Sequence, residues 1–526
     1  MKSVMPYRIL TVCVLLSARP ALAQCPAWGG AIHGSGLAGT AVRAMTVMPS
    51  CAGGQPELYV AVSTALGSTT ARVQRWNGSA WSAVGSGTAE VYSLAVYDHG
   101  AGAELYAGRN DGPHRWNGSA WVPLGPWFAG DGVHAMAVFD PGTGPELYIA
   151  GAFSVGSNVR RWDGTTLAIA DGPSTVGGAF VKALIVYDDG AGADLYCGGT
   201  FPESFPINVA RIGGPGTPVG ALGSSVVSLG VFDDGSGSAL FAGMAASPFL
   251  AKRTDPGWTT VTGAPNGPVH ALLAYDDGTG DALYVGGSFT TAGGVSCANI
   301  ARWDGATWSA LGSGADEEVF ACAHFDDGSG AGDALHVGGR FTTIDGMPVS
   351  HVARRTGCFA QPGDLFCSGD GSLLTPCPCA PPDVVPAPPA APGHGCANSF
   401  DLAGGKLIGA GNALADTVTL TATHVSPSGY AQFFVGTAAD SFGVAVGDGV
   451  RCAGGALTRF GGQFATCGTV RYPNPAAGWT LPLSVVSGAT PGSGASRHYQ
   501  VSYRNAAAGF CSAGTTNLTS GYRIAW

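Results

Sequence analysis

The chain has 526 residues and a formal net charge of −10, and 85 of its residues are glycines. Lysine and arginine form no cluster, which argues against nucleic acid or an anionic membrane as a partner. Because 45% of the residues are hydrophobic, the low charged fraction of 11% indicates a turn-rich all-β protein with a filled core and not a disordered chain.

The N-terminus has the pattern of a secretory signal peptide. Lys2 and Arg8 precede an apolar run at 9–16, and the small residues at 21–23 favour cleavage after Ala23. This run is too short for a transmembrane segment, and no later run reaches the necessary length. We therefore expect residues 1–23 to be a signal peptide and the mature protein to be secreted to the extracellular space or the cell surface.

A repeat fills the next part of the chain. Its copies begin with similar apolar runs at Val91, Val133, Val181, Val226, Val269 and Val319, and a degenerate copy begins at Val42. The spacing of about 40–50 residues is that of the four-stranded blades of β-propellers. In the best-formed copy, strands are expected at 269–275, 282–289, 298–303 and 307–314, with Asp-Gly turns between paired strands.

The last copy lacks its fourth strand, and the N-terminus supplies a segment that fits there. Ala27-Trp28-Gly29-Gly30 resembles the Trp-containing run that follows Thr307, but no strand precedes it to pair with. Using this segment as the missing strand would remove the exposed edges of an open ring. The sequence therefore predicts an all-β seven-bladed β-propeller at 24–357, closed by the N-terminal strand.

The repeat resembles kelch-type blades of secreted bacterial proteins. The resemblance rests on the glycine doublets at 198–199, 286–287 and 338–339, which are followed by a tryptophan or its equivalent in the third strand. The Asp-Asp-Gly hairpins and the Arg-Trp-Asp-Gly turns depart from the kelch pattern. The resemblance implies the fold, and it implies little about function.

Beyond the repeat, the sequence predicts a Cys/Pro-rich linker at 358–398 and a small disulfide-stapled, β-sandwich-like domain at 399–526. Strand-like runs lie at 416–425, 430–436, 469–473, 479–486, 497–504 and 521–526. The segment around Cys367, Cys377 and Cys396 resembles a C-terminal module of exported bacterial proteins, which implies attachment or sorting.

The sequence has 14 cysteines, of which Cys13 leaves with the signal peptide. An oxidising compartment makes the others disulfide candidates, and their odd number leaves at least one thiol free or paired outside the chain. A zinc site is the alternative for the cluster, but the spacing of its cysteines favours disulfides. The candidates in the C-terminal region are Cys358, Cys367, Cys377, Cys379, Cys396, Cys452, Cys467 and Cys511.

Acidic hairpins join the first and second strands of each copy. Carboxylates and carbonyls in such turns could hold calcium, the one cofactor that the sequence leaves possible. Aspartates also form tight turns by accepting hydrogen bonds from their own backbone, and this interpretation is favoured because no D-x-D-x-D-G core occurs. The calcium candidates are Asp188, Asp189, Asp233, Asp234, Asp276, Asp277, Asp326 and Asp327.

The second position of each first strand varies from copy to copy. If the first strand is innermost, these side chains surround the mouth of the central channel on the face of the variable loops, where binding sites usually lie. Aromatic, imidazole and cationic groups there would suit a sugar or an acidic group. The candidate ligand-binding residues are Arg43, Tyr92, His134, Lys182, His270 and Phe320, with Val227 as the remaining member.

An arginine recurs near the end of every third strand, and recurrence in every blade indicates a role in packing. The members of this set are Arg75, Arg115, Arg161, Arg211, Arg253, Arg302 and Arg354.

No catalytic motif stands out, and no catalytic residue is predicted. H-E-x-x-H, a phosphate-binding glycine loop and a persuasive Ser/His/Asp set are all missing from the sequence. The sequence therefore favours a binding or adhesion protein whose propeller recognises a glycan or a protein partner. The alternatives are an extracellular polysaccharide-active hydrolase or lyase and a structural component of the envelope.

Overall fold

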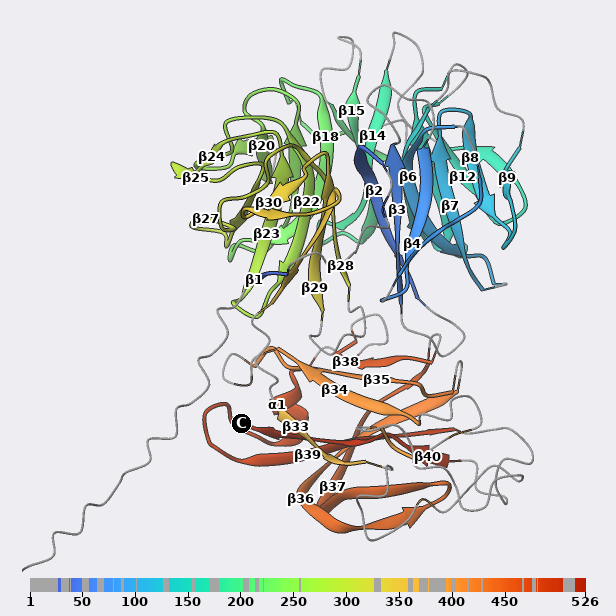
Figure 1. The fold of residues 1–526 in the computed structure, drawn as a ribbon, viewed down its shortest axis with the longest axis vertical. Helices are drawn as coiled ribbons and strands as arrows, with labels where there is room; N and C mark the ends of the chain where they lie inside the picture. Colours follow the sequence, from blue (N-terminus) through green and yellow to red (C-terminus); the bar gives the residue numbers. More distant parts are fainter. Residues whose placement is uncertain are drawn as a thin grey trace, which may run out of the picture.

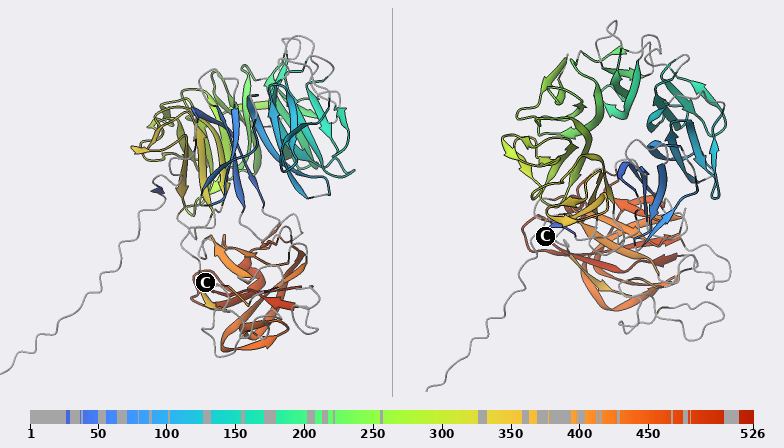
Figure 2. Two further views of the ribbon diagram at one scale, coloured as in Figure 1. Left: turned by 45° about the vertical axis from the view of Figure 1, so that its right-hand side comes forward. Right: turned by 45° about the horizontal axis from the view of Figure 1, so that its top comes forward.

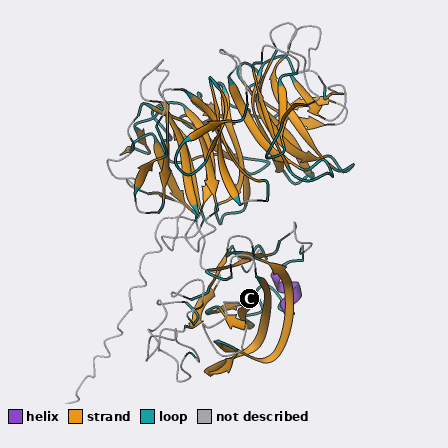
Figure 3. Ribbon diagram, turned by 90° about the vertical axis from the view of Figure 1, so that its right-hand side faces the viewer, coloured by secondary structure: helices purple, strands orange, loops and turns teal. Residues whose placement is uncertain are grey.

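The computed structural model describes most of the chain beyond the signal segment, which lies outside the described residues. Described are residues 27–29, 37, 39–49, 56–63, 71–78, 80–86, 89–100, 102–125, 132–153, 157–170, 179–201, 208–212, 217–220, 222–254, 257–325, 333–357, 363–368, 377, 394–396, 398, 404–411, 413, 416–426, 429–465, 468–474, 479, 481–504 and 516–526. The all-β class predicted from the sequence is confirmed, since strands dominate and the single helix has five residues (Figure 3).

Seven antiparallel sheets of four strands each lie between residues 27 and 356 (Figure 1). Their first strands are β2 (Ala41–Met48), β6 (Val91–Asp98), β10 (Val133–Phe139), β14 (Phe180–Asp188), β18 (Val226–Asp233), β22 (Val269–Asp276) and β28 (Val319–Phe325). The second strands are β3 (Glu57–Ser63), β7 (Ala103–Arg109), β11 (Glu146–Gly151), β15 (Ala193–Thr200), β19 (Ser238–Met244), β23 (Asp281–Gly287) and β29 (Ala334–Gly339).

The third strands are β4 (Ala71–Trp76), β8 (Gly112–Trp116), β12 (Val159–Trp162), β16 (Val209–Ile212), β20 (Leu250–Thr254), β26 (Ile300–Trp303) and β32 (Val352–Thr356). The fourth strands are β5 (Trp81–Ala83), β9 (Trp121–Pro123), β13 (Leu167–Ile169), β17 (Thr217–Pro218), β21 (Gly257–Thr260), β27 (Trp308–Ala310) and β1 (Ala27–Trp28). Two further hairpins, β24 (Thr291–Ala292) with β25 (Val295–Ser296) and β30 (Thr343–Ile344) with β31 (Met347–Pro348), lie between second and third strands.

The first strands of neighbouring sheets contact one another, and β28 contacts β2, so the sheets are arranged around a ring (Figure 2, right). Tyrosine hydroxyls bridge several neighbouring sheets at the hairpin end of the first strand. Tyr97 donates a hydrogen bond to the Pro145 carbonyl at 2.8 Å, and Tyr275 donates one to the Asp333 carbonyl at 2.9 Å. In each case the tyrosine hydroxyl gains a hydrogen-bond acceptor on the neighbouring sheet.

The N-terminal strand β1 belongs to the same sheet as β28, β29 and β32. Ala27 and Trp28 pair with Thr356 and Arg355, and the Trp28 indole donates a hydrogen bond to the Leu311 carbonyl at 2.8 Å. The indole is buried and lies 5.5 Å from the Arg355 guanidinium. Strand β1 therefore covers the outer edge of β32.

The C-terminal domain consists of two antiparallel sheets. The larger contains β33 (Gly363–Cys367), β41 (Gly521–Ala525), β39 (Ser496–Arg504), β36 (Tyr430–Val446), β37 (Gly449–Phe464) and β40 (Thr516–Leu518). The smaller contains β34 (Lys406–Ala410), β35 (Thr419–Thr423) and β38 (Val470–Tyr472). Their shared core includes Phe433, Phe460, Tyr472, Tyr499 and Trp526.

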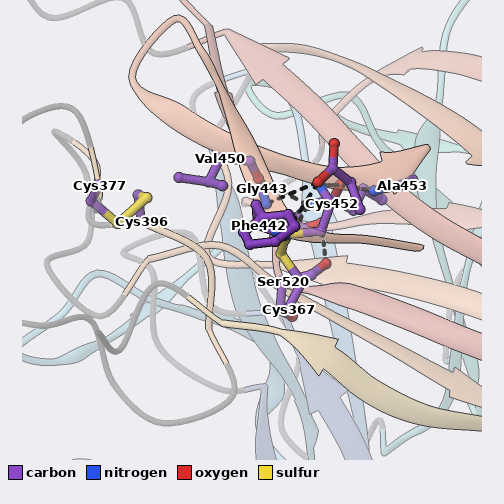
Figure 4. The surroundings of a disulfide bond; sticks show 12 residues. Cys367, Cys377, Cys396, Phe442, Gly443, Val450, Cys452, Ala453 and Ser520 are labelled. Atoms are coloured by element: carbon purple, nitrogen blue, oxygen red, sulfur yellow. Dashed lines mark hydrogen bonds between the residues drawn. A yellow bond between two sulfur atoms is a disulfide. The ribbon is translucent and has the colours of Figure 1, made fainter. Parts of the chain in front are cut away.

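Two disulfides of the C-terminal domain join segments that are distant in the sequence (Figure 4). Cys367 of β33 is bonded to Cys452 of β37, and Cys377 is bonded to Cys396. Beside the first bond, the fully buried Gln500 side chain accepts hydrogen bonds from the backbone N–H groups of Cys452 and Ala453, at 2.6 and 3.0 Å. The Cys367–Cys452 disulfide therefore lies beside a buried polar side chain that is hydrogen-bonded.

The remaining cysteine predictions have mixed outcomes. Cys358, Cys379, Cys467 and Cys511 lie outside the described residues. Cys197, Cys297 and Cys322 are unpaired, so the expectation that every exported cysteine is first a disulfide candidate is wrong for them. Cys197 and Cys297 are buried on strands or loops of the repeat, where a thiol packs as a small apolar group.

Two segments of the C-terminal region differ from the sequence prediction. Residues 483–487, inside the run expected as a strand, form the helix α1 (Leu483–Ser487), which starts after Pro482 and ends at Gly488 with φ of 58°. Apolar runs this short do not distinguish strand from helix. Residues 363–367, expected in the linker, form β33 and pair with β41. The described residues contain no helix long and apolar enough to cross a bilayer.

Candidate functional site

The six predicted mouth residues all lie one position after the start of a first strand, or two positions in the case of β2 and β14. All six are partly buried. Together with Val227 they lie at the ring's end opposite the hairpins that join the first and second strands. We call this group the mouth cluster: Arg43, Tyr92, His134, Lys182, Val227, His270 and Phe320.

One side of the mouth cluster is a chain of ring contacts. The Tyr92 and His134 ring centroids are 4.7 Å apart, and the His134 and Phe180 centroids are 6.2 Å apart. The Lys182 ammonium lies 4.9 Å from the centroid of the Phe180 ring. Three neighbouring sheets thus place aromatic faces beside one cation.

The other side of the mouth cluster has fewer ring contacts, and its residues come from the last two sheets. The His270 and Phe320 centroids are 5.4 Å apart, and the Arg340 guanidinium lies 5.7 Å from the Phe320 ring. Arg340 forms an ion pair with Glu318 at 3.1 Å. Val227, on the sheet between Lys182 and His270, is a short aliphatic residue that separates the two sides.

The charge of Arg43 is neutralised by Glu90, at the edge of the mouth cluster. Its Nε atom lies 3.0 Å from a Glu90 carboxylate oxygen and donates a hydrogen bond to the Ser63 hydroxyl at 2.9 Å. Glu90 also accepts a hydrogen bond from the Tyr92 hydroxyl at 3.2 Å. Arg43 is therefore held in position by Glu90 and Ser63, and Tyr92 in turn holds Glu90.

Four residues around the mouth cluster were missed by the sequence analysis: Glu90, Phe180 and Arg340 contact its members, and Glu318 pairs with Arg340. Glu90, Phe180 and Glu318 each precede the buried valine that begins a repeat, and this position varies between copies as strongly as the one after it. Aligning the copies one residue further upstream would have found these three.

Burial and the lysine charge determine the ionisation of the mouth cluster. Burial and, to a lesser degree, the Lys182 ammonium lower the pKa of His134 to about 4. Burial also lowers the pKa of His270, against a smaller raising effect of the Glu318 carboxylate and with a still smaller lowering effect of Lys182. Both imidazoles are therefore neutral at pH 7, and each offers one donor and one acceptor nitrogen.

Lys182, His134 and His270 are partly exposed members of the cluster whose polar atoms are available to a ligand. Within the described residues, none of the three side chains has a hydrogen bond or an ion pair to another protein group. Burial lowers the pKa of Lys182 because no carboxylate offsets the loss of water around its ammonium. A ligand with oxygen acceptors and hydroxyl groups would satisfy all three.

The hairpin aspartates hold their own turns. The Asp188, Asp233 and Asp276 Oδ1 atoms each accept hydrogen bonds from the N–H groups two and four residues later, at 2.8–3.0 Å. Asp189, Asp234 and Asp277 likewise accept from the backbone two residues on. Asp326 and Asp327 lie outside the described residues.

These hydrogen bonds are the ones that the turn-forming interpretation expects. Among the residues that the structure describes, no three acidic, histidine or cysteine side chains are grouped closely enough to hold a metal ion. The second aspartates also interact with other side chains: Asp234 pairs with Lys252 at 2.6 Å, and Asp189 accepts from the Tyr196 hydroxyl at 3.3 Å.

The recurring arginines mostly pair within their own sheet, as expected for residues that stabilise packing. Arg115, for example, lies 3.2 Å from Glu104 on the neighbouring strand. The assignment of Arg253 to this set is wrong, because Lys252 occupies the equivalent register opposite Phe241. Arg253 instead pairs with Trp258 and reaches the preceding sheet, where its guanidinium donates to the Tyr196 hydroxyl at 3.2 Å.

A cavity of about 520 Å³ lies between the hairpin end of the ring and the C-terminal domain. Its lining includes Asp233, Asp276 and Asp281 from the sheets and Thr419 and Arg471 from the C-terminal domain. Burial and the nearby carboxylates of Asp276 and Asp233 raise the pKa of Asp281. The C-terminal domain therefore lies against the hairpin end, and the mouth cluster is at the opposite end (Figures 1 and 2).

Comparison with known proteins gives distant structural likenesses only. No protein-family model matches the chain, and no curated protein matches it in sequence. Similar solved structures include the extracellular domain of the putative one component system BT4673 from B. thetaiotaomicron, with a TM-score of 0.42, 12% identity, and coverage of 65% of this chain and 41% of that chain.

The extracellular domain of the putative hybrid two component system BT3049 from B. thetaiotaomicron has a TM-score of 0.42 and 10% identity, covering 94% of this chain and 57% of that one. BBS1N in complex with ARL6DN has a TM-score of 0.37 and 10% identity, covering 63% of this chain and 98% of that one. The chain thus spans about half the length of the two bacterial domains. Likenesses this distant carry no argument about its ligand.

Proposed function

We propose that this chain is an extracellular binding protein that recognises a glycan through the mouth cluster. In this proposal the seven sheets are the blades of a closed, kelch-like propeller, residues 1–23 are a cleaved signal peptide, and the C-terminal domain serves attachment. The two disulfides support an oxidising compartment, where such bonds persist.

The observation that carries the proposal is the pairing of aromatic faces with polar groups that have no hydrogen-bond partner among the described residues. Tyr92, Phe180 and Phe320 offer faces against which the apolar side of a sugar ring can pack. His134 and His270 offer donor and acceptor nitrogens that no described protein group uses. Binding sites combine a largely apolar lining with a few such convergent polar groups.

The position of the C-terminal domain also favours a binding site at the mouth end of the ring. It lies against the hairpin end, so the mouth cluster stays accessible when both domains are present. Rigid strands hold the mouth residues at fixed positions, which reduces the ordering cost of binding.

A glycan array probed with the full chain tests the proposal. The variant His270→Ala removes one imidazole from the mouth cluster. Ile169→Ala is the matched control, because Ile169 lies on an outer strand and is 62% exposed. We expect saturable binding of one glycan class by the wild type and the control, weakened at least about 10-fold in His270→Ala. Absence of any saturable glycan, or equal binding by all three proteins, would contradict the proposal.

A second candidate function is cleavage of a polysaccharide at the cavity between the domains. Acid–base hydrolysis needs a carboxylic acid that keeps its proton, and burial together with the nearby Asp276 and Asp233 carboxylates raises the pKa of Asp281. A reducing-end assay with the array-positive polysaccharide tests it. Activity that is lost in Asp281→Asn and kept in His270→Ala would support this function over binding alone.

A further inference from the structure

Lys182 is the one cation of the mouth cluster that has no anionic partner among the described residues. Arg43 is paired with Glu90 at 3.0 Å and Arg340 with Glu318 at 3.1 Å, whereas the Lys182 ammonium lies over the Phe180 ring, 4.9 Å from its centroid. A half-buried ammonium loses part of its hydration without a compensating charge, which is unfavourable unless an anion arrives.

The two histidines lie on either side of this lysine. His134 is on the sheet before it, and His270 is two sheets after it, with Val227 between. The Lys182 charge acts on both imidazoles, and on His270 it opposes the stronger effect of the Glu318 carboxylate. The neutral imidazoles supply hydrogen-bonding nitrogens without adding charge. One acid group of a ligand would therefore match the single charge of Lys182.

The aromatic residues limit what kind of molecule carries that acid group. Tyr92 and Phe180 lie before Lys182 around the ring, and Phe320 lies beyond His270. Ring faces pack against the C–H side of a pyranose, and the histidines suit its hydroxyl groups. A small inorganic anion would use Lys182 and leave the rings and imidazoles without contacts.

We infer that the ligand of the mouth cluster is an acidic glycan, a sugar chain whose carboxylate or sulfate group pairs with the Lys182 ammonium while its rings pack against the flanking aromatic side chains. This inference rests on the proposed glycan-binding function and names its substrate class. The charges of the mouth lead to this class of ligand. Arg43 and Arg340 are neutralised by Glu90 and Glu318, and Lys182 has no anionic partner among the described residues.

Calorimetric titration of the full chain with matched oligosaccharides tests the inference. The probes are a trigalacturonate, its fully methyl-esterified form, and a sulfated disaccharide with its unsulfated counterpart. We expect the acidic member of at least one pair to bind about 10–100-fold more tightly than its neutral counterpart, as one charge-assisted hydrogen bond of about 1.5–3 kcal/mol would give. The pair that discriminates shows whether a carboxylate or a sulfate is recognised.

Two variants assign the effect to Lys182. Lys182→Gln removes the charge and should abolish the preference for the acidic member. Lys182→Arg keeps the charge and should keep the preference. Lys406→Gln, in β34 of the C-terminal domain, is the matched control for the same loss of charge away from the mouth.

The outcomes separate this inference from the function on which it rests. If acidic and neutral oligosaccharides bind the wild type equally, or if Lys182→Gln keeps the preference, the acidic-glycan inference is overturned and glycan binding stands. If no oligosaccharide of any kind binds on the array or in titration, the proposed function itself fails. A folded Lys182→Gln protein, shown by an unchanged melting temperature, is required for either conclusion.

Discussion

The Cγ1 methyl of Val42 lies so close to Gly338 that a Cβ atom on this glycine would be only 2.6 Å away. Val42 is in the first strand of the first sheet, and Gly338 is in the second strand of the last. The same contact recurs between successive sheets, for example Val226 against Gly198, also at 2.6 Å. The junction between the two ends of the ring is therefore packed like the internal junctions.

Substitution of this glycine should destabilise the ring. Gly338→Ala forces a Cβ into the valine, and overpacking of this kind costs about 1–3 kcal/mol. We expect Gly198→Ala to cost a similar amount, because its contact has the same geometry. Gly257→Ala is the control, since a Cβ there would meet nothing within 4 Å.

Scanning calorimetry of the full chain measures all three variants. A lowered transition in Gly198→Ala with an unchanged one in Gly338→Ala would show that the first and last sheets are not packed as tightly in solution.

Asp276 distinguishes turn formation from calcium binding. Its Oδ1 atom accepts hydrogen bonds from Gly278 and Gly280 at 2.8 and 2.9 Å. Asp276→Ala should cost about 1 kcal/mol because both hydrogen bonds to Oδ1 are lost, whereas Asp276→Asn keeps the oxygen and should stay within about 0.5 kcal/mol of the wild type.

The measurement is thermal unfolding of the full chain with added calcium and with a chelator. Both substitutions remove the carboxylate charge, so a calcium site would be weakened by both. Equal destabilisation of the two variants, together with loss of a calcium-dependent shift, would contradict the turn-forming role.

The Cys367–Cys452 bond should stabilise the C-terminal domain selectively. It joins residues separated by 85 positions, and cross-links of that span contribute about 3–5 kcal/mol by restricting the unfolded chain. We expect the double variant Cys367→Ala/Cys452→Ala to lower the unfolding transition of the C-terminal domain and leave that of the ring unchanged. Cys322→Ala, which removes an unpaired thiol in β28, is the control.

Calorimetry without reductant resolves the two transitions, and limited proteolysis identifies which domain opens. A double variant whose two transitions both fall by the same amount would show that the domains unfold as one unit, against this prediction.

The sequence was sufficient for the features that short segments determine. The Asp-Gly turns at 276–280 fix one hairpin, and the first-strand pattern that begins at Val269 fixes which side chains face the neighbouring sheet. The mouth positions could be named because a periodic repeat places equivalent residues at equivalent points of a ring.

Features that depend on contacts between distant segments could not be derived in this way. The Arg43–Glu90 pair joins two sheets, and the cavity at Asp281 and Arg471 depends on how the two domains pack. Arg253 was misplaced by one residue because its register is set by Trp258 on the fourth strand and not by the local pattern. The short helix at 483–487 has too few residues to show a helical period.

His134 should make the protein less stable in mild acid. Its pKa is about 4 in the folded state, against about 6.5 in an unfolded chain, so the unfolded state binds the proton first as the pH falls. The free energy of unfolding should therefore decrease from about pH 6.5 downward until the folded state is also protonated near pH 4, by no more than about 3 kcal/mol.

The variant His134→Gln should remove this part of the pH dependence. Melting temperatures of the wild type and the variant, measured between pH 7 and pH 4, should converge as the pH falls or cross in favour of the variant. A constant difference over the whole range would show that His134 titrates normally in the folded protein.

His324 should have the opposite effect at the hairpin end. Its imidazole contacts the Asp333 carboxylate at 2.7 Å, and this hydrogen bond is the main reason why its pKa is raised despite burial and the Arg471 charge. Because the folded state holds the proton more tightly, the stabilisation is fully present below about pH 6.5 and is lost as the pH rises through the raised pKa.

Since the His324 side chain is 45% exposed, solvent screening should limit the stabilisation to less than about 1 kcal/mol. Asp333→Asn removes the charge pair, so the melting temperature should fall most at pH 5.5 and little at pH 9. His134→Gln provides the contrast, because its effect should grow toward acid by raising stability instead of lowering it. A deficit in Asp333→Asn that is as large at pH 9 as at pH 5.5 would mean that the carboxylate acts through its backbone neighbours and not through the imidazolium.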